Sequence, residues 1–192
     1  MKTVDITKIG EYRFSNVDRP GKPIFIIKVV ENVEHYVDLM KKEFDFKVIQ
    51  GLLDRSDFKM VFDSMHGAAG PYAKAIFGRE LGDKVLLKDC DPSPDFNKGH
   101  PDPNLICAKE LVDLMGLESG KSNYDFGVSC DGDADRNMIL GKCFFVTPSD
   151  SLALLTSLSH HFLKSPLKGV ARSMPTSGAV DKVVKKMGVS LY

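Results

Sequence analysis

A six-residue acidic segment constrains this chain more than any other feature of its sequence. Residues 131–136 read Asp-Gly-Asp-Ala-Asp-Arg, so three carboxylates alternate with small residues and an arginine follows. The apolar segments on either side, residues 124–130 and 137–140, predict two core strands joined by a tight turn. Two carboxylates about 4 Å apart at an effective dielectric near 20 repel by roughly 4 kcal/mol. A turn with three of them therefore predicts a bound cation.

The type of cation follows from the ligand atoms. Carboxylate oxygens are hard ligands that suit Mg²⁺ or Ca²⁺, with Mn²⁺ as an alternative. An EF-hand loop would need Gly at its sixth position and Glu at its twelfth. Counted from Asp131, those positions hold Arg136 and Lys142, which excludes the EF-hand. A solvated acidic turn remains as the alternative to a metal site.

Strands and helices alternate along the chain, which predicts an α/β layer structure. Asn32 is the expected N-cap of the first helix, Pro71 is expected in the first turn of a later one, and Gly82 and Gly116 are expected to end helices. The expected elements beside the acidic turn and its two strands are strands at 24–30, 58–62 and 85–87, helices at 33–44, 46–53, 71–81, 105–115 and 147–162, a loop at 90–104, and a strand–helix–strand unit at 170–192.

The overall composition restricts the kinds of partner and the cellular compartment to be expected. The 26 basic and 26 acidic residues balance, so charge favours neither nucleic acid nor an anionic membrane as partner. No apolar run approaches the roughly 20 residues that span a bilayer, and the first residues lack a signal-peptide core. The four cysteines are widely spaced without a Cys-x-x-Cys pair, which indicates reduced thiols in a cytoplasmic protein.

Five segments, in order, resemble the α-D-phosphohexomutase family and most closely its phosphoglucomutase branch. The acidic segment continues to Gly141 in the manner of that family's metal-binding loop. The other four segments are Asp63–Tyr72, which reads DSMHGAAGPY, His100–Leu105, which reads HPDPNL, Phe144–Asp150, which reads FFVTPSD, and Ala171–Gly178, which reads ARSMPTSG.

The resemblance implies a fold and a domain organisation. It implies the family's second domain, a three-layer α/β fold with a mixed sheet, at residues 23–163. Residues 1–22 would form an N-terminal connector, and residues 164–192 a linker with the first strand–helix–strand of a second, similar domain. The phosphoserine loop, the sugar-recognition loop and the phosphate-binding fourth domain of the family have no counterpart in this sequence. We therefore expect no catalytic nucleophile in this chain.

The resemblance also implies a function. Family members of the phosphoglucomutase branch interconvert glucose 1-phosphate and glucose 6-phosphate through a phosphoserine enzyme and glucose 1,6-bisphosphate. By resemblance Asp131, Asp133 and Asp135 would ligate Mg²⁺, while Asp135 and Arg136 would contact the phosphorylated hexose. The chain would act with the remaining domains of the same enzyme and be inactive alone. Pairing with a neighbouring aspartate is the structural alternative for Arg136.

Two alternatives stay open at this point. One is a non-enzymatic relative of the parafusin or aciculin type, and the other is a mutase for a different phosphohexose. Ala134 is a departure within the acidic segment, because the family more often has Gly there and Ala would be strained if the position needed a positive φ. His66 and His100 are expected to have structural roles.

Overall fold

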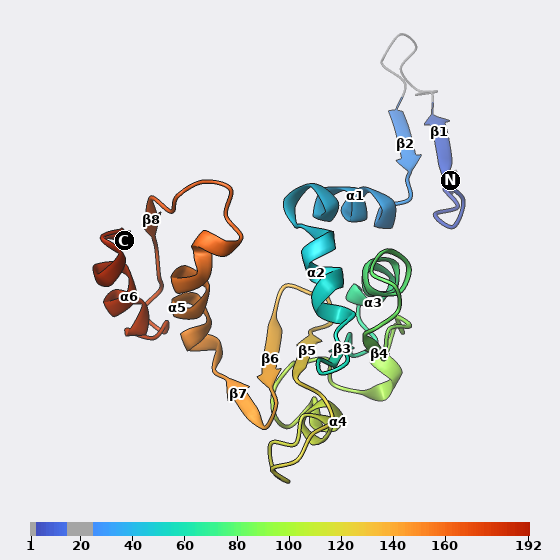
Figure 1. Ribbon diagram of the computed structural model, residues 1–192. Helices are drawn as coiled ribbons and strands as arrows, with labels where there is room; N and C mark the ends of the chain where they lie inside the picture. The colour runs from blue at the N-terminus through green and yellow to red at the C-terminus, as the bar shows by residue number, and fades with distance from the viewer. Residues whose placement is uncertain (1–2, 15–24) are drawn as a thin grey trace.

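The computed structural model describes residues 3–14 and 25–192. Its centre is a five-stranded sheet of order β4-β3-β5-β6-β7. Strands β3, β4 and β5 are parallel, and β6 and β7 extend the sheet as antiparallel strands. The mixed sheet confirms the predicted α/β fold class (Figure 1).

In this central unit, from residue 25 to residue 158, the elements agree with the predicted order, apart from one short 3₁₀ helix and one short strand that were not predicted. They are β2 (Phe25–Val29), α1 (Val33–Glu43), α2 (Phe46–Leu53), β3 (Met60–Asp63), α3 (Ala69–Ala73), the π-helix η1 (Lys74–Glu80), β4 (Leu86–Lys88), the short 3₁₀ helix η2 (Phe96–Lys98), α4 (Lys109–Leu114), β5 (Phe126–Cys130), β6 (Asn137–Gly141), β7 (Phe144–Val146) and α5 (Pro148–Leu158). Strand β7, which is only three residues long, was not predicted.

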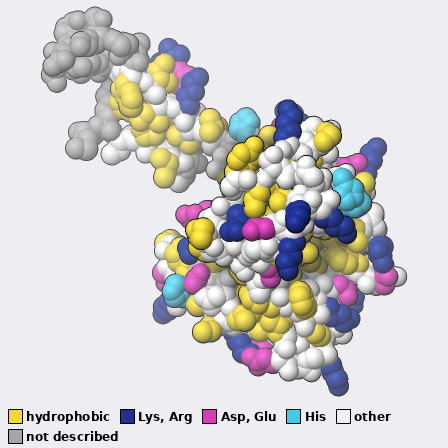
Figure 2. Space-filling view, turned by 90° about the vertical axis from the view of Figure 1, so that its left-hand side faces the viewer, with side chains coloured by type: hydrophobic (Ala, Val, Ile, Leu, Met, Phe, Trp, Pro, Cys, Tyr) yellow, Lys and Arg dark blue, Asp and Glu magenta, His cyan; other side chains and the backbone are white. Residues whose placement is uncertain are grey.

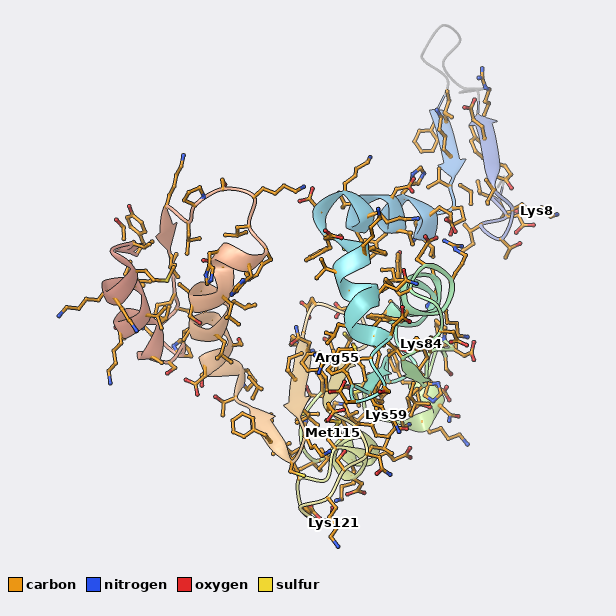
Figure 3. All side chains as sticks on the ribbon, viewed as in Figure 1. Lys8, Arg55, Lys59, Lys84, Met115 and Lys121 are labelled. Carbon is orange, nitrogen blue, oxygen red and sulfur yellow. The ribbon has the colours of Figure 1, made fainter. Side chains whose placement is uncertain are left out.

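Helices cover both faces of the sheet, which gives three layers. On one face α2, α3 and η1 pack around Phe62 and Leu81. On the other face α4 places Leu111 and Met115 against Met138. Figure 1 labels α4, and Figure 3 labels Met115. Alternate residues of β3 point to opposite faces, since Val61 joins the α4 core and Phe62 the other.

The cap of α1 differs from the predicted one. Asn32 occupies the N-cap position, but its side chain makes no capping hydrogen bond. Instead the Glu31 carboxylate accepts from the backbone N–H groups of Val33 and Glu34, at 3.0 and 2.8 Å. Glu31 therefore satisfies the free N–H groups of the first turn from one position further out. At α2, Asp45 caps in the usual way by accepting from Lys47 and Val48.

Two predicted helices have different boundaries in the structure. The helix expected at 71–81 begins at Ala69, keeps Pro71 in its first turn and continues from Lys74 as a π-helix, which ends before Gly82 at φ 82°. The helix expected at 105–115 begins only at Lys109. The Asn104 side chain accepts from the N–H groups of Ile106 and Cys107, both at 2.8 Å, and holds those residues in a turn.

A β-hairpin precedes the central unit. Strand β1 (Gly10–Phe14) pairs antiparallel with β2, so the connector predicted at residues 1–22 contains a strand. Residues 15–22 of that connector lie outside the described residues, as does the start of the strand predicted at 24–30. The hairpin projects from the rest of the molecule with apolar side chains on its visible face, Phe25 being 66% exposed (Figure 2).

The last part of the chain forms a small separate core. Strands β8 (Gly169–Val170) and β9 (Ser190–Leu191) are parallel and α6 (Ala179–Met187) connects them, as the predicted strand–helix–strand requires. Val180 and Val184 of α6 pack against Ala153 of α5. Helix α5 ends at Leu158 and a 3₁₀ turn, η3 (Ser159–His161), follows, so the helix predicted to reach 162 is shorter. This unit lies on the far side of β6 and β7 from α3 (Figure 1).

Two further sequence expectations can be compared with the described residues. No helix among them is both long enough and apolar enough to cross a membrane. All four cysteines are described, and none of them forms a disulfide, as expected.

The α4 core provides a test of the fold. Leu111 is fully buried, so Leu111→Ala leaves a cavity between α4 and the sheet and should lower the free energy of unfolding by about 2–5 kcal/mol. Ile106→Ala, at a side chain that is 85% exposed, is the control and should change it by less than about 0.5 kcal/mol. Urea unfolding followed by circular dichroism measures both; equal effects would contradict this packing.

Candidate metal centre

The acidic segment lies at the end of the sheet where β5 turns into β6. Cys130 and Asn137 are the last paired residues of the two strands, and residues 131–136 form the turn between them. The turn is closed by backbone hydrogen bonds from Asp131 N–H to the Arg136 carbonyl and from Ala134 N–H to the Asp131 carbonyl, both 3.2 Å. A strand–turn–strand hairpin was predicted here, and the structure confirms it.

Asp131 is a buried carboxylate held by one residue. Its side chain is 1% exposed. Arg136 donates to both of its oxygens, through the backbone N–H to Oδ1 and through Nε to Oδ2, each at 2.9 Å. Burial by itself would raise the pKa of Asp131, but these hydrogen bonds and the guanidinium charge outweigh it and lower the pKa. Asp131 is therefore a fixed anion at neutral pH.

The other two carboxylates of the turn are exposed and close to Asp131. One oxygen of each of the three aspartates lies within 4.8 Å of the others. The charge of Asp133, and after it burial and the charge of Asp131, raises the pKa of Asp135. Arg136 offsets part of this repulsion, with Nε 3.4 Å from Asp135 Oδ1. Three converging hard oxygen donors, one of them from the buried Asp131, fit a divalent cation such as Mg²⁺ or Mn²⁺.

Ala134 has the positive φ at which the sequence predicts strain for an alanine. Its φ is 65°, in the left-handed region that favours glycine. A residue with a Cβ carries a cost of about 1–2 kcal/mol there. The turn still brings the three carboxylates together, so the alanine is accommodated at an energetic cost.

Two contacts of the turn were not foreseen from the sequence. The Ala68 N–H, from the chain between β3 and α3, donates to the Gly132 carbonyl at 2.9 Å. Asp102, from the HPDPNL segment, has Oδ1 3.8 Å from Nη1 of Arg136. Both contacts join parts of the chain that are far apart in sequence. The resemblance to the family pointed to the two segments, but nothing in the sequence predicted that they contact the acidic turn.

The histidines have structural contacts. The Nδ1 atom of His66 donates to the Asp91 carbonyl at 3.0 Å, and Nε2 lies 3.3 Å from Asp89 Oδ1. The His66 contacts agree with the structural role predicted for it. For His100 the described contact is a backbone one, from the Asp102 N–H to its carbonyl at 2.9 Å, so the role of its side chain stays a prediction.

Cys130 directly precedes the acidic turn. Its side chain packs against the core that contains Phe62 and Cys90. Burial, and then the charges of Asp131 and Asp63, raise the pKa of the Cys130 thiol to about 11.

The segment that forms β3 to β6, with the acidic turn between β5 and β6, matches a known protein family. Residues 34–143 match the family described as phosphoglucomutase/phosphomannomutase, alpha/beta/alpha domain II. The chain belongs to this family, and its fold is that of the family's second domain.

Particular relatives cover the whole chain. Phosphoglucomutase-2 of Paramecium tetraurelia is 52% identical over all of this chain and 34% of its own length. The cytoplasmic phosphoglucomutase 2 of Zea mays is 49% identical over 98% of this chain and 33% of its own length. The chain thus spans about a third of the length of these curated relatives.

Solved structures agree with the fold. The open form of the exocytosis-sensitive phosphoprotein pp63/parafusin, a phosphoglucomutase from Paramecium, matches 98% of this chain and 34% of its own length, with a TM-score of 0.90 and 51% identity. A phosphomannomutase-type structure from Thermus thermophilus matches 84% of this chain and 36% of its own, with a TM-score of 0.68 at 24% identity, and supports the fold alone.

The strain at Ala134 predicts a stabilising substitution. Ala134→Gly removes the left-handed Cβ cost but adds conformational entropy to the unfolded chain, so we expect the free energy of unfolding to rise by about 0.5–1 kcal/mol. Ala153→Gly, in the middle of α5, is the control of opposite sign, since glycine weakens a helix. Thermal unfolding measures both, and a lower melting temperature for Ala134→Gly would contradict the conformation described.

The repulsion at Asp135 predicts a pH-dependent effect. Because its pKa is raised in the folded state, the fold loses stability as pH rises through that pKa. Asp135→Asn should therefore raise the melting temperature of the metal-free chain at pH 7, and the gain should shrink as the pH is lowered through the raised pKa. Asp113→Asn, which removes a Lys109 ion pair of 2.6 Å, is the control and should give no gain. A pH-independent effect of Asp135→Asn would contradict the repulsion.

Proposed function

We propose that this chain is the metal-binding part of a phosphoglucomutase that interconverts glucose 1-phosphate and glucose 6-phosphate. The observation that carries the proposal is the convergence of the three aspartate oxygens within 4.8 Å, beside Arg136, in a member of this family. Relatives at 49–52% identity that are named phosphoglucomutases support the choice of reaction.

Each residue of the turn has a proposed role. Asp131, Asp133 and Asp135 hold Mg²⁺, with Mn²⁺ as a substitute, and the buried Asp131 fixes the position of the site. Arg136 keeps Asp131 in place through its backbone N–H and Nε, and its side chain is 67% exposed. Its Nη1 and Nη2 groups, of which Nη1 lies 3.8 Å from Asp102 Oδ1, are proposed to donate to a phosphate of the hexose, for which a planar, permanently charged donor is suited.

The reaction needs groups from outside this chain. When bound, the metal supplies charge neutralisation at a phosphate oxygen, and phosphoryl transfer depends mostly on such neutralisation and on positioning. The nucleophile is proposed to be a phosphoserine in another domain of the same enzyme, with glucose 1,6-bisphosphate as intermediate. The partners of this chain are then those domains and the phosphorylated hexose, and the site of action is the cytoplasm, as the names of the plant relatives state for those proteins.

A second candidate function has one specific observation in its favour. The Paramecium structure that is 51% identical to this chain is described both as an exocytosis-sensitive phosphoprotein and as a phosphoglucomutase. A role outside metabolism is therefore the second candidate for the protein to which this chain belongs, and absence of mutase activity in the full-length protein would favour it over the first. A mutase for another phosphohexose is separated by the choice of sugar phosphate.

Loss of a proposed metal ligand tests the function. In the full-length enzyme, Asp133→Ala should lower kcat for glucose 1-phosphate by roughly 10²–10³-fold, because several kcal/mol of charge stabilisation are lost. Asp133 is an exposed turn residue, so the melting temperature should not fall. Asp83→Ala, at another exposed residue, is the control. Unchanged turnover in Asp133→Ala would exclude the metal role, and higher turnover with mannose 1-phosphate than with glucose 1-phosphate would favour the other sugar.

The chain by itself provides a further test. Without the phosphoserine we expect the purified 192-residue chain to convert no glucose 1-phosphate. Coupled assay of glucose 6-phosphate formation measures this, with the full-length enzyme as the positive control. Conversion by the chain alone would place the nucleophile inside it and contradict the proposal.

A further inference from the structure

The acidic turn touches the chain segment that follows β3. The Ala68 N–H donates to the Gly132 carbonyl at 2.9 Å. At Gly67 the two backbones come so close that a Cβ would lie 2.8 Å from the Gly132 oxygen and 2.9 Å from the Asp131 oxygen. Since ordinary contacts begin near 3.4 Å, a side chain at residue 67 would force the turn away by about half an ångström.

The segment that makes this contact is itself firmly held. Met65 and His66 have φ of 49° and 58°. The Asp63 carboxylate accepts from the Met65 N–H at 2.8 Å, and the His66 N–H donates to the Asp89 carbonyl at 2.9 Å. The Ser64 hydroxyl donates to the same carbonyl at 2.6 Å. Residues 63–68 are thus tied to the end of β4 and cannot move aside without breaking these bonds.

The opposite side of the turn is also closed. A Cβ at Gly132 would lie 2.9 Å from the ring of Phe96 and 3.3 Å from Pro101. Gly132 therefore sits between the 63–68 segment and the Phe96 ring. It is the residue between the buried Asp131 and the exposed Asp133, so its place sets the separation of those two carboxylates.

We propose that Gly67 is a positioning residue for the metal centre. By allowing the 63–68 segment to contact the backbone of Asp131 and Gly132, it fixes the distance at which the carboxylates of Asp131 and Asp133 meet a cation. Phe96 contributes from the other side. The inference rests on the proposed role of the aspartates as metal ligands.

The test is the affinity for Mn²⁺ alone, measured by the electron paramagnetic resonance signal of the free ion. Outer contacts that orient metal ligands are typically worth 10–100-fold in metal affinity. We expect Gly67→Ala to weaken Mn²⁺ binding by about that factor. Phe96→Ala should weaken it too, and because it removes atoms it avoids the clash if Gly67→Ala fails to fold.

Two glycines provide matched controls. At Gly78, in η1, a Cβ would meet nothing within 4 Å, so Gly78→Ala should not lower stability and should leave the Mn²⁺ affinity unchanged. Gly120 has φ of 68° and open space around it, so Gly120→Ala strains the backbone and lowers stability. It precedes Lys121, which lies at the bottom of the molecule in Figure 3, at the other end of β5 from the turn. Its Mn²⁺ affinity should equal that of the unsubstituted chain.

The possible outcomes separate the two proposals. Equal Mn²⁺ affinity in Gly67→Ala, Phe96→Ala and the unsubstituted chain would overturn the positioning role and leave the metal site in place. Weaker binding in Gly120→Ala as well would overturn it too, because affinity would then follow stability. No Mn²⁺ binding by the unsubstituted chain would overturn the metal site and the positioning role together.

Discussion

The buried carboxylate of Asp131 is the constraint on which the rest of the site depends. A carboxylate out of contact with water is tolerated only when it is paired and hydrogen-bonded. Arg136 provides both from the opposite end of the same turn. That pairing fixes the turn between β5 and β6, and the turn fixes where the two exposed aspartates lie. Fold and site are therefore linked through one ion pair.

The sheet explains why the acidic turn can be held from outside. Strands β3 and β5 are parallel neighbours, so the segments that follow them emerge at the same edge of the sheet. The chain after β3 therefore contacts the turn after β5 directly. Ligand sites in α/β sheets commonly lie at this edge, where the carboxyl ends of parallel strands meet. Strand β6 is antiparallel and returns from the same edge, so the turn is short, and two backbone hydrogen bonds close it.

Local sequence patterns predicted most elements because each has a local cause. The acidic residues are contiguous, and apolar runs mark β3, β5 and β6. The failures have non-local or competing causes. Glu31 competes with Asn32 as a cap, Asn104 holds a turn where a helical pattern begins, and β7 is too short to show a period. Contact between Ala68 and Gly132 depends on the pairing of β3 with β5, which periodicity does not reveal.

The thiol beside the acidic turn has a consequence for chemical reactivity. Only a thiolate attacks electrophiles and oxidants efficiently, and Cys130, with a pKa of about 11, is almost entirely protonated at neutral pH. The same packing that keeps Asp131 out of water thus keeps its sulfur-bearing neighbour inert. A thiolate at this position would instead be open to oxidation and to capture by soft metals directly beside the buried carboxylate.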